Sequence, residues 1–349
     1  MHAQRIFIAD GKLRPIWRCL LSIPMVILAV LVAGKAGAFV AAGFPLGGWG
    51  QYVWSSVFTL PALLGTFELL TRVFDRKPLG SVGLAFCGRW QRELGTGLGL
   101  GALMILLVAA VERLLGLAQF SFSSAPPGRV LAWGAALLGM LFVAATNEEL
   151  VFRGYPFQRL VEALGGAGKF LAGKVLGVAA FERFAESLGA AGGVALFAGL
   201  FGLAHLANPS RTWISTLNTM LVGVPLALAY LRTRALWLPI GMHFTWNFFQ
   251  GYVLGLPVSG LEMPISVLRA EVSGETLLTG GAYGPEGGLL ATGVIVAGAV
   301  YLALSRRIYI SKEMRALVFG PTPAAAVVEA VVLREITAAQ ANIDRPESS

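Results

Sequence analysis

Apolar runs long enough to cross a membrane recur along the chain, and they limit its possible folds more than any other feature. A membrane-spanning helix needs about 20 predominantly apolar residues. Of the 349 residues, 56% are hydrophobic and only 13% are charged, whereas a soluble domain is about 25% charged. This composition excludes a disordered protein, a charged coiled coil and an ordinary soluble enzyme. We therefore predict a protein that lies mostly in lipid.

The apolar runs predict an all-α fold, a polytopic membrane bundle of about eight transmembrane helices that encloses a polar site. The first run has a basic flank, as in a signal peptide, but it is longer than a signal peptide's apolar region, so we expect a retained helix. The expected spans cover about residues 16–34, 52–70, 94–110, 130–145, 192–206, 213–231, 236–254 and 289–304.

Basic residues are concentrated in every second segment that joins these runs. They gather at both ends of the chain and in the second, fourth and sixth connecting segments, whereas the other connections are neutral or acidic. The positive-inside rule then places both termini in the cytoplasm. The Gly- and Ala-rich composition, together with the lack of an organelle-targeting leader, favours a bacterial inner membrane. We expect a membrane-embedded domain over residues 1–310, with a motif-bearing core at 130–255, and a cytoplasmic C-terminal tail over 311–349.

Two segments have the pattern of peripheral structure. Residues 169–188 alternate apolar and charged side chains at helical spacing, which is typical of a helix on the membrane surface. The tail from Pro321 onward is Ala- and Val-rich and then polar, so we expect a loosely attached helix with a disordered end. Cys19 and Cys87 are too few for a disulfide framework and lack a CxxC spacing. The net charge of +8 comes without a basic and aromatic patch, so no nucleic-acid partner is expected.

Polar residues inside the apolar runs indicate a functional site, because each ionisable group there costs about 2.5–3.5 kcal/mol on insertion scales. Glu148 and Glu149 close the fourth span, His205 ends the fifth, and His243 and Asn247 lie in the middle of the seventh. An i, i+4 spacing places His243 and Asn247 on one helix face. The same spacing allows Glu149 to pair with Arg153 and sets Phe201 against His205, while Glu148 points about 100° away from Glu149.

These residue types suit amide hydrolysis without a covalent intermediate. A glutamate in low dielectric acts as a general base toward water, and a histidine shares that water. A second histidine with an asparagine donates hydrogen bonds to the oxyanion that forms on a carbonyl. The chain has no GxSxG elbow, and neither cysteine lies where a nucleophile is expected.

At these residues the sequence resembles the CPBP family, which is also known as the CAAX prenyl protease, bacteriocin-processing or Abi family. Its pattern is EExxxR, then FxxxH, then HxxxN or HxxxD, on separate membrane helices. The chain has all three in that order, from Glu148 to Arg153, from Phe201 to His205 and from His243 to Asn247. The resemblance covers about residues 130–255.

The resemblance implies an integral-membrane endopeptidase that cleaves a membrane-associated or lipid-anchored protein or peptide. It implies that Glu148 is the water-activating base, that His205 helps to hold the water, and that His243 and Asn247 stabilise the oxyanion. Glu149 and Arg153 would support the first motif. We expect no cofactor and a metal-free, water-activating mechanism, because HExxH is absent and the possible metal ligands come from three helices. Because members are often described as metalloproteases, zinc held by Glu148, His205 and His243 is the alternative chemistry.

Other interpretations of the same residues stay open at the level of sequence. Glu149 and Arg153 also fit a purely structural ion pair. Glu148 also fits a carboxylate at the membrane interface that lipid headgroups solvate. His205 also fits a histidine that is hydrogen-bonded to a carbonyl or a lipid headgroup. His243 and Asn247 also fit polar residues that join membrane helices. The scaffold could bind a peptide without cutting it, as in bacteriocin self-immunity, or could relay protons in a transporter.

Overall fold

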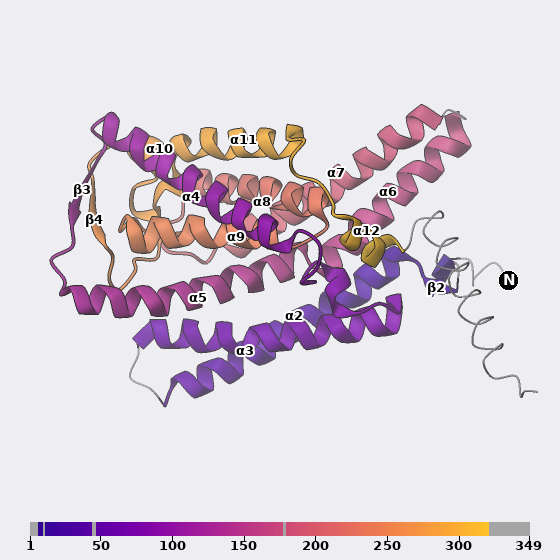
Figure 1. Ribbon diagram of the computed structural model, residues 1–349, viewed down its shortest axis with the longest axis horizontal. Helices are drawn as coiled ribbons and strands as arrows, with labels where there is room; N and C mark the ends of the chain where they lie inside the picture. The colour runs from indigo at the N-terminus through magenta and orange to yellow at the C-terminus, as the bar shows by residue number, and fades with distance from the viewer. Residues whose placement is uncertain (1–5, 10, 44–46, 177–178, 321–349) are drawn as a thin grey trace, which may run out of the picture.

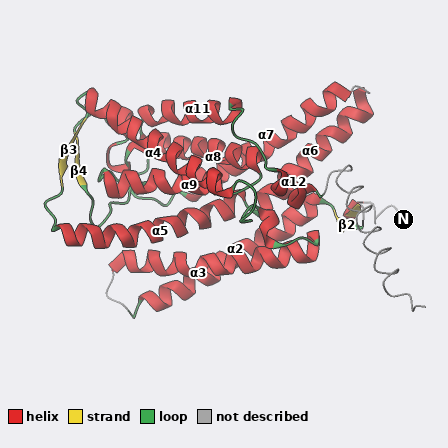
Figure 2. Ribbon diagram, viewed as in Figure 1, coloured by secondary structure: helices red, strands yellow, loops and turns green. Residues whose placement is uncertain are grey.

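The computed structural model describes residues 6–9, 11–43, 47–176 and 179–320, which form a bundle of long helices (Figures 1 and 2). The α-helices are α2 (Pro15–Ala41), α3 (Gly47–Leu70), α4 (Trp90–Leu114), α5 (Pro127–Arg153), α6 (Tyr155–Leu176), α7 (Ala179–Ala204), α8 (Trp213–Thr233), α9 (Trp237–Asn247), α10 (Thr276–Thr279), α11 (Leu289–Leu304) and α12 (Lys312–Phe319). Short π- and 3₁₀-helical segments lie at Thr71–Asp75, Leu79–Val82, Phe248–Val253, Gly281–Tyr283 and Pro285–Gly287.

Strands are few and short. β1 (Ile8–Ala9) pairs with β2 (Lys12–Leu13), and β3 (Ala118–Phe122) pairs with β4 (Leu268–Val272), both antiparallel. In the second pair Phe120 lies opposite Ala270, and the pair joins two connecting segments at one end of the bundle (Figure 1). Apart from these two strand pairs, the helices and strands named in the described residues are all helical, which agrees with the predicted all-α class.

Six of the described helices are long and apolar enough to cross a membrane, so the protein is an integral membrane protein. These six correspond to the first six of the eight expected spans, and the last two expected spans are shorter helices. The seventh consists of α9 with its π-helical extension, and α11, the eighth, has only 16 residues. Every residue of α9 from Trp237 to Trp246 is buried, so protein rather than lipid surrounds this helix and spanning length is not required of it.

The described part of the segment expected on the membrane surface is helical. Residues 169–176 and 179–188 belong to two long helices, α6 and α7, which pack against each other and extend beyond the rest of the bundle (Figure 1). The charged residues in this segment thus lie on the outer part of a helical pair. Of the expected tail, α12 packs near Leu79–Val82, whereas the part from Pro321 onward lies outside the described residues.

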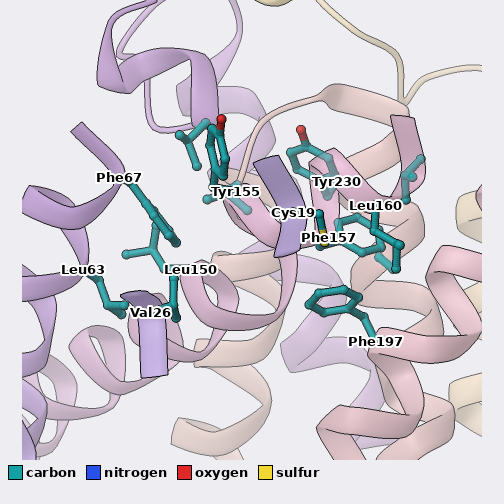
Figure 3. Close-up of a cluster of buried hydrophobic side chains, with 14 of the residues drawn as sticks. Cys19, Val26, Leu63, Phe67, Leu150, Tyr155, Phe157, Leu160, Phe197 and Tyr230 are labelled. Carbon is teal, nitrogen blue, oxygen red and sulfur yellow. The ribbon is translucent and has the colours of Figure 1, made fainter. Parts of the chain in front are cut away.

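The largest buried cluster joins the N-terminal helices to the helices that carry the polar motifs (Figure 3). Leu150 of α5 is fully buried with Leu63 and Phe67 of α3, and Phe157 of α6 packs edge-on against Phe197 of α7. Because the end of α5 lies inside this cluster, the two glutamates just before Leu150 have a fixed backbone.

Glycines bring α4 and α9 into backbone contact. A Cβ atom at Gly97 would overlap the carbonyl oxygen of Leu238, and one at Gly101 would overlap that of Met242. The Thr245 hydroxyl also donates to the Leu98 carbonyl across the same contact, at 2.9 Å. Small residues four apart allow this close approach of membrane helices, and they position the helix that carries His243.

Enlarging one of these glycines will therefore separate α4 from α9. We expect Gly97→Leu to lower the thermal unfolding temperature in detergent by several degrees, because overpacking costs about 1–3 kcal/mol. Gly99→Leu is the matched control, since a Cβ atom there meets no atom within 4 Å. Equal unfolding temperatures for the two variants would contradict the close contact.

Candidate active site

The end of α5 supplies two glutamates with different surroundings. The Glu149 side chain has no exposed surface, and its Oε1 accepts a hydrogen bond from the equally buried Arg153 at 3.1 Å. Arg153 also donates to the carbonyl of Gly223 on α8 at 3.1 Å, and its guanidinium lies 4.7 Å from the centre of the Phe201 ring. The expected i, i+4 pair is thus present, and it connects α5 with α7 and α8.

Glu149 has a second partner that spacing alone does not indicate. His243 Nδ1 lies 2.8 Å from Glu149 Oε1, and because an ionised carboxylate only accepts, Nδ1 is the donor. This bond joins α5 to α9 and leaves the Nε2 atom of His243 free for the cavity. Glu149 therefore orients His243 and links it to Arg153.

His205 follows directly after α7 and is oriented by its own chain. Its Nδ1 lies 2.7 Å from the carbonyl oxygen of Phe201, and its ring lies 4.8 Å from the Phe201 ring. A carbonyl oxygen only accepts, so Nδ1 carries the proton. In the neutral ring Nε2 is then an acceptor, directed at Glu148.

Glu148 lies between the two histidines. Its Oε2 is 3.8 Å from Nε2 of His205 and 3.8 Å from Nε2 of His243. These distances exceed a direct hydrogen bond but suit a bridging water. Within the described part of the chain, this buried oxygen has no hydrogen-bond partner. A water held by Glu148 and the histidines would supply the missing donor.

The polar residues face one cavity of about 330 Å³. Asn247, the last residue of α9, lines it one helical turn beyond His243. The structure therefore brings Glu148, His205, His243 and Asn247 to a single cavity, while Glu149 and Arg153 lie behind it. Part of the remaining wall is apolar and is formed by Gly101, Met104, Val222, Leu226, Met242 and Ile295.

The zinc alternative requires three protein ligands around one point. Zinc binds nitrogen at about 2.0–2.1 Å and carboxylate oxygen at about 2.0–2.2 Å. Across residues 6–9, 11–43, 47–176 and 179–320, no group of three or more His, Cys, Asp or Glu is arranged to hold a metal ion. The present geometry does not fit zinc, and we derive no chemical step through a metal.

Residues 130–249 match the family model described as "Type II CAAX prenyl endopeptidase Rce1-like". The chain contains a domain of this family, whose members are proteases. Neither a curated protein nor a solved structure matches the chain.

The Rce1-like domain begins in α5 and ends just after α9. It includes every residue of the three motifs, and the resemblance recognised from the sequence is confirmed. The helices before it and α11 after it lie outside the match, although residues from both regions line the cavity.

Sequence reasoning did not single out several polar residues that line this cavity: Asn208, Asn218, Ser259 and Glu286. Glu286 lies in an acidic connection that also contains Glu262, Glu271 and Glu275. Those three glutamates are exposed, whereas Glu286 is partly buried. One signal was available, since Glu286 lies in a Gly-Pro-Glu-Gly run just before an apolar helix, where the backbone turns sharply.

Proposed function

We propose that the chain is an intramembrane endopeptidase that hydrolyses a peptide bond with a water activated by Glu148. Its substrate would be a membrane-associated or lipid-anchored protein or peptide, as for a CAAX protease. The observation that carries the proposal is the position of Glu148 Oε2, which has no hydrogen-bond partner among the described residues and lies 3.8 Å from the Nε2 atoms of two oriented histidines. Membership of a protease family supports it.

In the proposed reaction, water donates one proton toward Glu148 Oε2 and the other toward Nε2 of His205. Its oxygen then attacks the carbonyl carbon of the scissile bond while Glu148 takes the proton. The tautomer of His205 set by Phe201 supports this role, because only an unprotonated Nε2 accepts from water. Glu148 then delivers the proton to the leaving amine.

The developing oxyanion would be held by His243 and Asn247. Nδ1 of His243 already donates to Glu149, so donation from Nε2 requires a proton on both ring nitrogens. Glu149 provides the negative charge that an imidazolium needs beside it, and Arg153 in turn neutralises Glu149. The buried pair thus supports an electrophilic His243.

Isotope labelling combined with hydroxylamine trapping tests whether water attacks the peptide bond directly. The protein is reconstituted in liposomes with a prenylated CAAX-type reporter peptide, and a matched peptide carries a palmitoyl chain instead. In a single turnover in H₂¹⁸O, we expect one ¹⁸O atom in the new carboxylate of the product and no hydroxamate when hydroxylamine is present. Formation of a hydroxamate would indicate an acyl-enzyme and contradict the proposed mechanism. Failure to cut either peptide would contradict the proposed activity.

Chelation tests the metal-free reading. Because the described residues form no metal site, we expect the initial cleavage rate after exhaustive treatment with EDTA and 1,10-phenanthroline to stay within about twofold of the untreated rate. The control is a second preparation treated identically and then supplied with zinc. Loss of activity that added zinc restores would show that the site uses a metal.

A further inference from the structure

A connecting segment outside the Rce1-like domain closes one side of the cavity. It contains the turn Val258–Leu261, of which Val258, Ser259 and Leu261 line the cavity. Glu286 of the 3₁₀ segment Pro285–Gly287 lines it as well. The proposed chemistry makes no use of this carboxylate.

Both oxygens of the Glu286 carboxylate already have donors. Oε2 accepts from the backbone N–H and from the hydroxyl of Ser259, each at 2.7 Å, and Oε1 accepts from Nε1 of Trp246 at 3.2 Å. Burial raises the pKa of Glu286, and the hydrogen bonds from Ser259 oppose that rise. A carboxylate occupied in this way serves to hold groups together rather than to exchange protons with water.

The backbone at Glu286 is fixed independently of its side chain. Asn218 of α8 donates to the carbonyl oxygens of Glu286 and Gly288, both at 2.9 Å, and Thr292 donates to Asn218 at 2.7 Å. A change confined to the carboxylate therefore leaves the anchoring of this segment to α8 and α11 in place.

The carboxylate connects two parts of the proposed site. Trp246 lies on α9, three residues after His243 and directly before Asn247. On the other side, the carbonyl oxygen of Ser259 accepts a hydrogen bond of 3.1 Å from Asn208. Asn208 lies three residues after His205. The contact is tight, because a Cβ atom at Gly260 would overlap the carbonyl oxygen of Pro209.

We infer that Glu286 is a positioning residue of the substrate cavity: it holds the turn Val258–Leu261 between α9 and the segment after His205. The inference rests on the proposed function for its meaning in catalysis, but the hydrogen bonds exist regardless of activity. By holding the turn Val258–Leu261, Glu286 keeps this wall of the cavity in one place, so that a bound peptide meets a preformed surface.

The variant Glu286→Gln tests the positioning role. An amide has only one acceptor oxygen, so it cannot satisfy the two Ser259 donors and Trp246 as the carboxylate does. We expect the amide of Ser259 to exchange hydrogen for deuterium about tenfold faster than in the wild type, measured on peptides that cover residues 255–263 in detergent. Glu262→Gln, in the same connection and exposed, is the matched control and should exchange like the wild type.

Kinetics with the reporter peptide separate positioning from folding and from chemistry. For Glu286→Gln we expect KM to rise about tenfold while kcat stays within about twofold, because the wall loosens but Glu148 and the histidines remain. Ser259→Ala should raise KM in the same way, and the double variant should add little to either single change.

Each outcome has a definite meaning. Wild-type exchange at Ser259 together with a wild-type KM overturns the inference. A fall in kcat at unchanged KM, or a lowered unfolding temperature, assigns Glu286 to chemistry or to folding and also overturns it. If the wild type cuts no peptide, the proposed function fails by itself, and the exchange measurement still decides whether Glu286 holds the turn.

Discussion

Replacing Glu148 by glutamine will reduce kcat for the reporter peptide by about 10³-fold or more, because a general base contributes about 10²–10⁴-fold and no other described carboxylate lies between His205 and His243. An amide keeps the size of the side chain but cannot take a proton from water. The partly exposed position of Glu148 predicts that the variant inserts and unfolds like the wild type. The measurement is single-turnover cleavage in liposomes, with the unfolding temperature recorded in parallel.

The control is Glu271→Gln, an exposed glutamate on β4 that should retain full activity. His205→Ala and His243→Ala should each lose cleavage as well, since each removes one of the groups around the water. Normal cutting by Glu148→Gln would refute the mechanism. An inert wild type whose cellular phenotype survives Glu148→Ala would instead favour a peptide-binding or self-immunity protein.

Replacing Arg153 by alanine will reduce the free energy of unfolding by about 3–5 kcal/mol, the usual cost of removing one partner of a buried ion pair. The change would leave Glu149 buried with only His243 as a partner, and it would free the carbonyl of Gly223. We expect poor recovery of folded protein at 37 °C. Denaturant titration in detergent, followed by near-UV circular dichroism, measures the loss.

Arg72→Ala provides the matched control. Arg72 pairs with Glu68 at the same i, i+4 spacing, but its side chain is 73% exposed. An exposed pair of this kind contributes about 0.3–0.5 kcal/mol. The double variant Glu149→Gln/Arg153→Met, which removes both charges, should recover part of the stability lost in Arg153→Ala. If Arg153→Ala is as mild as Arg72→Ala, the buried pair does not stabilise the fold.

Local spacing was sufficient for the parts of the site that lie on one helix. The i, i+4 rule placed Arg153 beside Glu149 and the ring of Phe201 beside His205, and both contacts are present. The helical periodicity and the apolar runs likewise located the helices that carry the three motifs. These inferences succeed because the geometry of an α-helix depends only on positions a few residues apart.

Contacts between helices could not be predicted in this way. His243 is 94 residues from Glu149 in the sequence, and neither motif predicts that Nδ1 of His243 hydrogen-bonds to the Glu149 carboxylate. The short length of α9 has the same origin, since burial by neighbouring helices rather than bilayer thickness sets it. Glu286 was missed because its surroundings are created by a turn and a helix, each distant in sequence.

The glycine contact between α4 and α9 has a consequence for how a substrate enters. Because the backbones of these two helices touch directly at the glycines, no layer of side chains between them can repack, and one helix cannot shift along the other. His243 and Asn247 therefore belong to a rigid wall of the cavity. We expect admission of a peptide to depend on the turn Val258–Leu261, which is held by hydrogen bonds from Asn208 to the Ser259 carbonyl and from the Ser259 amide to Glu286.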